Sequence, residues 1–406
     1  MKALRLTAAV LALAPISTPA AAAQWPPPMP ATLDLSVRET AGVSRSGEVL
    51  RSGVPLPRSL AVTSTASLAV VDAGGTPVPA EFRVLARWNA GLSNTSAPIQ
   101  WVLVAFPATV AANATATYRL VTNGSVANPA PAAPVTVSVN GSQVTVGTGA
   151  ATFRVGGAAS VPFDEVTRGG APLVTGGALA TTISGTPYGH STTRSVTVEH
   201  QGPLSAVVTV QGAYDMPARG GGVLSSLRRY VFTAGSPTAV VRQVASWEGS
   251  DCFVQDYDTR SCGGNLNALR ADRVRSTFLL AGAAPRDLSA VGAFAAPAAT
   301  ATAGAGATAS LRQLLRANRS APQAFQVDLP GVATSGTTAD GGMLTASTPG
   351  GTVAVALERM HRFEPQALRL LAEGSLAIDL VDDRAWIGNR QGLFATWALA
   401  ALPASP

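Results

Sequence analysis

Short runs of alternating apolar and polar residues, separated by Gly, Pro and Asn-Gly turns, recur along the whole chain. In the clearest of them, Val135, Val137 and Val139 lie on one side of a strand, and a second strand returns after Asn140-Gly141. A period of two residues is that of a β-strand, and Asn-Gly favours a two-residue type I′ hairpin. No long stretch has the 3.6-residue period of a helix. The sequence therefore predicts an all-β fold.

The chain is long enough for more than one domain. Its 406 residues contain a Pro- and Ala-rich stretch at 125–134, a composition typical of an extended linker. We therefore predict one domain over residues 24–128, a small barrel or sandwich, and another over 135–406, where more than eight strands favour a large β-sandwich. In the first domain we expect strands at 33–39, 68–72, 81–86, 99–106 and 116–121. In the second we expect a short helix at 359–371 and a loop at 288–311, which is mostly Ala, Gly and Thr.

The N-terminus has the pattern of an export signal. Lys2 and Arg5 precede an apolar stretch at 6–16, and four alanines at 20–23 supply the small residues that a signal peptidase requires. We predict a signal peptide over residues 1–23 and a periplasmic or secreted protein. The apolar stretch is too short to span a bilayer, and no later run is long and apolar enough, so we expect no membrane span in the mature chain.

The charge pattern excludes two classes of function. The net charge of +6 falls to about +4 without Lys2 and Arg5, and Lys2 is the only lysine, so lysine chemistry is excluded from the mature protein. The arginines are scattered, and the only adjacent pair is Arg228-Arg229. A surface that follows nucleic-acid phosphates needs clustered cations, so we expect no nucleic-acid partner.

Cys252 and Cys262 are the only cysteines. In an oxidising compartment, such a pair in a polar segment predicts a disulfide. Asp256 and Asp258 between the cysteines, with Asp251 just before Cys252, could hold Ca²⁺. Their spacing is not that of an EF-hand, and a stapled, solvated loop is the simpler interpretation. No Cys/His spacing indicates zinc, and we predict no other cofactor.

Several phrases resemble a known family. Residues 49–57, 72–79 and 99–106 are similar to the N-terminal RIFT barrel of PcRGLX/YetA-like proteins, the exo-rhamnogalacturonan lyase group. Residues 229–237 and 390–397 are similar to the central β-sandwich of that group. The resemblance covers nearly the whole mature chain, and its motifs are structural rather than catalytic.

The resemblance implies a lyase that acts on the galacturonic acid and rhamnose backbone of pectin. Members of the group generally continue into a C-terminal α/α toroid, and their activity depends on residues in or near it. This sequence shows no helical repeat after the predicted sandwich. We therefore transfer no catalytic residue from the family.

The residues themselves offer one catalytic-looking cluster. Elimination from a uronic acid needs a base for the C5 proton, a cation beside the carboxylate and an acid for the leaving oxygen. Tyr188, His190 and Arg194 lie within eight residues on a predicted loop. A solvated or packing role is the alternative for all three, and for His200 and His361 we expect hydrogen-bonded surface positions.

Two tryptophans are candidates for carbohydrate binding. Trp88 and Trp101 could stack on the apolar C–H face of a pyranose, or they could be buried in the core of the first domain.

Our first hypothesis is an exported pair of β-domains that associates with a pectic polysaccharide or oligosaccharide and lacks a complete active site. The alternatives are an active rhamnogalacturonan lyase that uses Tyr188, His190 and Arg194, or a cell-surface structural module.

Overall fold

The fold is that of a computed structural model, which describes residues 5–8, 31–157, 161–216, 223–248, 261–262, 265–266, 268–294, 296–314, 324–360, 365–383, 385–388 and 392–404. The chain divides into two compact units. The first unit holds residues 2–134 and 202–204, and the second holds 135–201 and 205–406. No helix of seven or more residues occurs in the part of the chain that is described, and the predicted all-β fold is confirmed.

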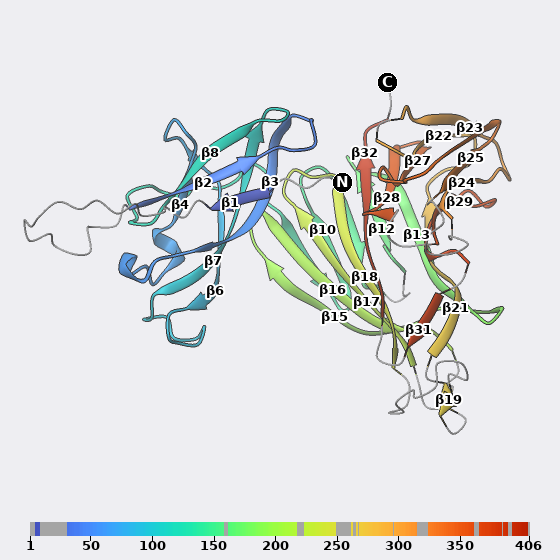
Figure 1. The fold of residues 1–406 in the computed structure, drawn as a ribbon, viewed down its shortest axis with the longest axis horizontal. Helices are drawn as coiled ribbons and strands as arrows, with labels where there is room; N and C mark the ends of the chain where they lie inside the picture. Colours follow the sequence, from blue (N-terminus) through green and yellow to red (C-terminus); the bar gives the residue numbers. More distant parts are fainter. Residues whose placement is uncertain are drawn as a thin grey trace, which may run out of the picture. The chain divides into compact units, whose positions relative to one another are not determined.

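The first unit contains two antiparallel sheets (Figure 1). The five-stranded sheet has the order β1 (Arg5–Ala8), β2 (Thr32–Arg38), β8 (Thr115–Val121), β4 (Ala69–Val71) and β5 (Pro77–Val78). The three-stranded sheet has the order β3 (Arg45–Pro55), β7 (Ile99–Val110) and β6 (Glu81–Arg87), and two 3-10 turns, η1 (Arg58–Leu60) and η2 (Thr65–Ser67), connect β3 to β4. The rings of Phe106 and Tyr118, 4.8 Å apart, lie in the core of this unit.

The second unit is a β-sandwich of two large antiparallel sheets (Figure 1). The main path of the 13-stranded sheet is β26 (Val332–Gly336), β25 (Phe325–Leu329), β24 (Ala309–Gln313), β29 (Gln366–Leu370), β30 (Leu376–Val381), β21 (Ala268–Leu280), β13 (Ala171–Ile183), β12 (Glu165–Arg168), β11 (Thr152–Val155), β10 (Gln143–Gly147) and β9 (Thr136–Asn140). Off this path, β14 (Thr186–Tyr188) pairs with β13, and β31 (Ala385–Gly388) pairs with β21.

The facing sheet has nine strands. Their order is β15 (Thr192–Gln201), β16 (Ser205–Ala213), β17 (Val223–Thr233), β18 (Thr238–Glu248), β32 (Gly392–Leu402), β28 (Gly351–Leu357), β27 (Met343–Thr348), β22 (Arg286–Val291) and β23 (Ala299–Ala303). A separate pair, β19 (Ser261–Cys262) and β20 (Asn265–Leu266), completes the described strands.

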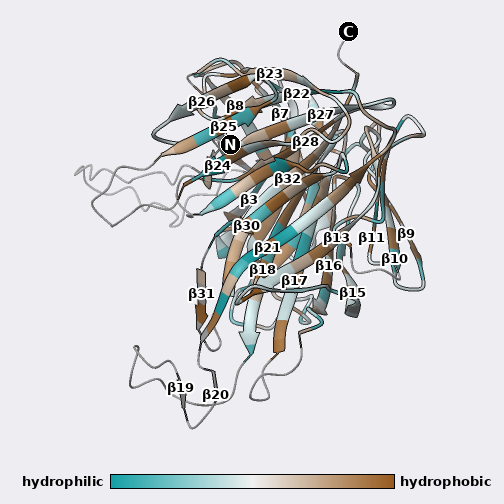
Figure 2. Cartoon of the chain, turned by 90° about the vertical axis from the view of Figure 1, so that its right-hand side faces the viewer, coloured by the Kyte–Doolittle hydropathy of each residue, from teal (hydrophilic) through white to brown (hydrophobic). Residues whose placement is uncertain are grey.

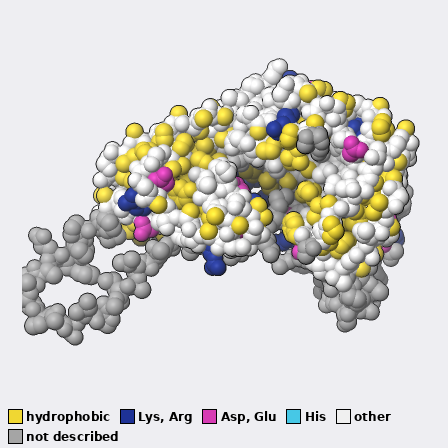
Figure 3. All heavy atoms as spheres, turned by 90° about the horizontal axis from the view of Figure 1, so that it is seen from above, with side chains coloured by type: hydrophobic (Ala, Val, Ile, Leu, Met, Phe, Trp, Pro, Cys, Tyr) yellow, Lys and Arg dark blue, Asp and Glu magenta, His cyan; other side chains and the backbone are white. Residues whose placement is uncertain are grey.

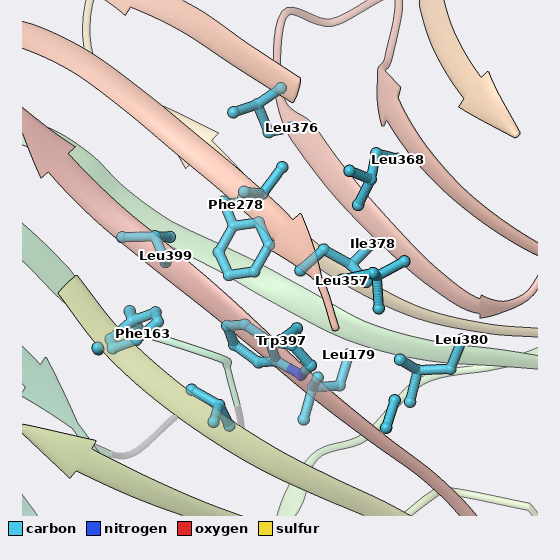
Figure 4. Close-up of a cluster of buried hydrophobic side chains, with 14 of the residues drawn as sticks. Phe163, Leu179, Phe278, Leu357, Leu368, Leu376, Ile378, Leu380, Trp397 and Leu399 are labelled. Carbon is cyan, nitrogen blue, oxygen red and sulfur yellow. The ribbon is translucent and has the colours of Figure 1, made fainter. Parts of the chain in front are cut away.

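The core of the sandwich lies between these two sheets. Trp397 on β32 has no exposed surface, and its ring lies 5.5 Å from that of Phe278 and 6.2 Å from that of Phe163 (Figure 4). Figure 2 shows hydrophilic and hydrophobic residues alternating along β21, as expected when one face of a strand lies in the core. Burial of the apolar face of each strand therefore holds the two sheets together.

Three local predictions were wrong. The hairpin between β9 and β10 pairs Asn140 with Gln143, and within its loop only Gly141 has a positive φ, which fits a type II′ turn rather than type I′. In the predicted helix at 359–371, residues 366–370 form strand β29, because Leu368 and Leu370 alternate into the core. The predicted loop at 288–311 contributes to β22, β23 and β24, where the small side chains of Ala and Thr still fit a pleated sheet.

The position of Trp397 generates a stability prediction. Trp397→Ala should lower the free energy of unfolding by about 3 to 5 kcal/mol, because it removes a large buried ring and leaves a cavity. Phe394→Ala is the matched control on the same strand: Phe394 is 49 % exposed, so its loss should change stability by about 0.5 kcal/mol or less. Urea unfolding followed by circular dichroism measures both, and equal losses would contradict the described burial.

Candidate functional site

His190 lies where the chain crosses from one sheet of the sandwich to the other, between β14 and β15. Its side chain points into the sandwich: the residue is 7 % exposed, and Nε2 lies 2.5 Å from the Ser226 hydroxyl on β17. The imidazole also meets the ring of Tyr214 edge-on, with centroids 5.0 Å apart. His190 therefore occupies a packed interior position.

The neighbours of His190 fix the crossing segment. The backbone N–H and the hydroxyl of Ser191 both donate to Oδ1 of Asp215, at 3.1 and 2.6 Å. The N–H of Asp215 donates to the carbonyl of Gly189 at 2.9 Å. These bonds hold the His190 backbone on both sides, so its side chain has a defined direction.

Burial lowers the pKa of His190 to about 4, and the positive charge of Arg228 adds to this effect, while Asp215 opposes it. The imidazole is therefore neutral at pH 7. An imidazole with this pKa is a weak base. An efficient general base has a pKa near the working pH, so His190 is poorly suited to that role.

The structure describes only part of the predicted catalytic cluster. Tyr188 is half-buried on β14 and packs against the hydrophobic core. The backbone of Arg194 belongs to β15, but its side chain lies outside what the structure describes. His200 also lies on β15, and His361 is outside the described residues. The catalytic role of Tyr188, His190 and Arg194 stays a prediction, which the absorbance of an unsaturated product would check.

A row of buried polar side chains accompanies His190, and the sequence analysis missed it. Every second residue of β17 from Ser226 to Tyr230 points inward, and even the charged Arg228 is only 1 % exposed. Nη1 of Arg228 donates to the carbonyl of Val161 at 2.5 Å and to the Tyr230 hydroxyl at 3.2 Å. The only signal in the sequence was the adjacent pair Arg228-Arg229. Successive residues of a strand point to opposite faces, so one of the two arginines must point inward.

In the first unit, Trp101 is a surface residue. It is 41 % exposed on β7, and its indole lies against Gly53 of the neighbouring strand, where a Cβ would stand 3.4 Å from Cε3. Leu85, 40 % exposed, and the exposed Arg83 come from β6 on the other side. The absence of a side chain at Gly53 leaves room for the ring, and the result is an exposed aromatic surface with Arg83 on the neighbouring strand, opposite Leu103.

Trp88 has a different setting. It is half-buried, and its indole N–H donates to the carbonyl of Leu56 at 3.1 Å. The two predicted sugar-binding tryptophans therefore differ: Trp101 offers an exposed ring, and Trp88 fixes a loop.

A second charged surface lies on the outer face of the 13-stranded sheet, where arginines surround two buried aspartates. Arg275 on β21 donates from Nε and Nη2 to the two oxygens of Asp379, at 2.6 and 2.7 Å. Arg369 on β29 donates to Asp379 at 2.9 Å and also to Asp382. Nε of Arg312 on β24 donates to Oδ2 of Asp382 at 2.7 Å. We call this group, together with Arg273, the arginine surface.

The arginine surface carries excess positive charge. Arg273 lies 4.0 Å from Asp379, so four guanidiniums face two carboxylates, which gives +4 − 2 = +2. The side chains of Arg273 and Arg312 remain 42 % and 36 % exposed. Elsewhere charge is sparse, and on the face shown in Figure 3 charged side chains are few.

The electrostatics of Asp382 fit this arrangement. Burial raises its pKa, but hydrogen bonds and charge from Arg369 and Arg312 outweigh burial, and the net pKa lies below the ordinary value. Asp382 is therefore ionised at neutral pH and keeps both guanidiniums in place. Arginines held in this way can offer their remaining N–H groups to an external anion.

No metal site is found within the described residues, and the predicted disulfide falls outside them. No group of three or more His, Cys, Asp or Glu side chains there could hold a metal ion. Cys252, the side chain of Cys262, and the possible Ca²⁺ ligands Asp251, Asp256 and Asp258 lie outside the described residues. In the same part of the chain, no helix is long and apolar enough to cross a membrane.

Comparison with known proteins gives distant structural similarity only. No protein-family model matches the sequence, and no curated protein matches it. A protein in the glycosyl hydrolase family 38 from Enterococcus faecalis is 9 % identical with a TM-score of 0.48, and the match covers 91 % of this chain and 44 % of that one. An α-mannosidase from Enterococcus faecalis V583 is 10 % identical with a TM-score of 0.46, covering 91 % and 43 %. This chain spans less than half of each of those proteins, and we draw no functional argument from them.

The buried, neutral state of His190 predicts a pH effect on stability. Its folded pKa of about 4 lies below the ordinary 6.5, so between these values the unfolded chain binds more protons. Stability from this group is complete above about pH 6.5 and is lost as the pH falls toward 4, by on the order of 3 kcal/mol. Urea unfolding at a series of pH values measures it.

His190→Asn removes the titrating group and should flatten this pH dependence, whatever its effect on stability at pH 7. A variant that loses as much stability between pH 6.5 and pH 4 as the parent protein would show that another group is responsible.

Proposed function

We propose that this protein binds acidic plant glycans of the pectic type through Trp101 on the three-stranded sheet and through the arginine surface, and that it is exported. In this proposal the chain corresponds to the two leading domains of a rhamnogalacturonan exolyase-like protein. The pattern at residues 1–23 supports export, and removal of that segment would take away, of the described strands, only β1, the edge strand of the five-stranded sheet. The phrases at 49–57 and 229–237 support the family resemblance.

The exposed indole of Trp101 is the observation that carries the proposal. The Trp101 ring packs against Gly53, and the residue keeps 41 % of its surface exposed to solvent. The C–H face of a pyranose is apolar and fits such a ring. Arg83, exposed on β6 and paired with Leu103 two residues along β7 from Trp101, is a candidate to meet a sugar carboxylate.

The arginine surface supports the acidic character of the glycan. From β24 to β21 it extends over three strand spacings, about 14 Å at about 4.8 Å each. Its guanidiniums are anchored by Asp379 and Asp382, so little side-chain entropy is lost when a second carboxylate binds. Galacturonate residues supply such carboxylates.

The geometry of His190 does not favour catalysis over binding. The imidazole is buried, it is bonded to Ser226, and its pKa of about 4 makes it a weak base. We therefore propose a binding function, and the lyase remains the alternative prediction.

Trp101→Ala tests the proposal. We expect calorimetric titration with rhamnogalacturonan oligosaccharides to show at least about tenfold weaker binding, equal to about 1.4 kcal/mol, because the stacking surface is lost. Trp101→Phe should keep part of the affinity.

Phe394→Ala is the control, since Phe394 is a comparably exposed aromatic residue in the second unit. Its affinity should equal that of the parent protein. Failure of the parent protein to bind any pectic saccharide would overturn the proposal, as would full affinity in Trp101→Ala.

A second experiment tests the arginine surface. Arg273→Gln together with Arg312→Gln should weaken binding of polygalacturonate by about tenfold at low salt and reduce its salt dependence, because exposed charges act through screened attraction. Binding of neutral galactan should not change. Arg229→Gln, which removes a partly exposed arginine from the other sheet, is the control, and an equal effect in that variant would show that only net charge matters.

A further inference from the structure

We propose that the second unit binds a small monovalent anion, such as chloride, inside the sandwich beside Arg228. The inference is independent of glycan binding, and it rests on the buried polar row around β17.

Arg228 is a cation in the interior. It is 1 % exposed on a central strand of the nine-stranded sheet, and β16 and β18 flank it. Two of its three nitrogens lack a partner: Nη1 donates to Val161 and Tyr230, but Nε and Nη2 are buried without any acceptor. Arginine cannot escape by losing its proton, so the charge itself must be compensated.

No carboxylate of the described residues forms an ion pair with Arg228. Asp164 is near enough to interact electrostatically, but its Oδ2 accepts the N–H of Gly157 at 2.8 Å. Burial raises the pKa of Asp164 above its ordinary value, and the charge of Arg228 counts among the smaller opposing effects. The Asp164 carboxylate is thus bonded to the backbone at Gly157 and forms no ion pair with Arg228.

Other buried polar groups lie around the same guanidinium, and each has a hydrogen-bond partner within reach. Gln243 is directly opposite Arg228 on β18; its oxygen accepts from Ser276 and Trp397, and its side chain also interacts with the Tyr214 hydroxyl. His190 contacts Ser226 through Nε2, and its own backbone carbonyl interacts with the ring. The rings of Tyr214 and His190 are 5.0 Å apart, and Arg228 acts electrostatically on both.

Nε and Nη2 of Arg228 can only donate, because a guanidinium has no acceptor. An acceptor-only ligand beside the guanidinium satisfies both nitrogens. A water molecule would fill some hydrogen bonds but would leave the buried charge unpaired, which costs several kcal/mol.

The ligand must also be small. Tyr230 and Trp247, both fully buried, belong to the strands that carry Arg228 and Gln243, so core side chains bound the space beside the guanidinium. Facing sheets lie about 10 Å apart, which leaves no room for a sugar acid between them. Chloride and bromide have the size and single charge that the site requires.

Anion-dependent thermal unfolding tests the proposal. At equal ionic strength, the Tm should be higher in sodium chloride or bromide than in sodium gluconate, whose anion is too large to enter, and it should rise with chloride concentration as expected for ligand binding. Arg228→Met should abolish the difference between the salts. Arg229→Met should retain it, because Arg229 points outward on the same strand and pairs with Glu199.

Crystals of the unaltered protein soaked in bromide give a direct answer even if Arg228→Met does not fold. We expect an anomalous bromide peak within hydrogen-bonding distance of the unpaired Arg228 nitrogens. A water molecule or a carboxylate of the chain at that position, no peak there, or the same salt response in Arg228→Met would overturn the proposal.

Discussion

The structure depends on the burial of one face of every long strand between the two sheets of the second unit. With so few charged residues, the chain gains its stability from apolar area, and Trp397, Phe278 and Phe163 meet at the centre of that area. The same pleat that sends these rings inward sends every second residue outward. Each strand therefore assigns its side chains to two separate environments, one for packing and one for contact with solvent.

This separation explains where chemistry can occur. Trp101 and the arginine surface lie on outward faces, where an extended polymer can reach them. His190 and Arg228 lie on the inner side, where burial makes the first neutral and leaves the second in need of a counter-charge. The polar groups inside the sandwich are therefore shielded from solvent, while the outer faces carry exposed aromatic and arginine side chains.

The sequence was sufficient for the fold class and for many strands, because alternation is a local signal. The sequence could not predict which face of a strand points inward where the two faces carry similar residues. On β17, the set with Arg228 and the set with Arg229 contain similar residues, and only tertiary packing decides which faces inward. For the same reason the sequence did not distinguish the exposed Trp101 from the half-buried Trp88. The scarcity of large apolar side chains hid the strands at 288–311, since Ala and Thr give a weak pattern.

The central claim is that ligands meet the outward faces and that the interior around His190 is closed to them. A crystal structure with a bound galacturonate oligosaccharide tests this most directly. The account predicts a pyranose ring over the indole of Trp101, and no saccharide atom in contact with Tyr188 or His190. A saccharide bound between the sheets at His190, with Trp101 free, would contradict it.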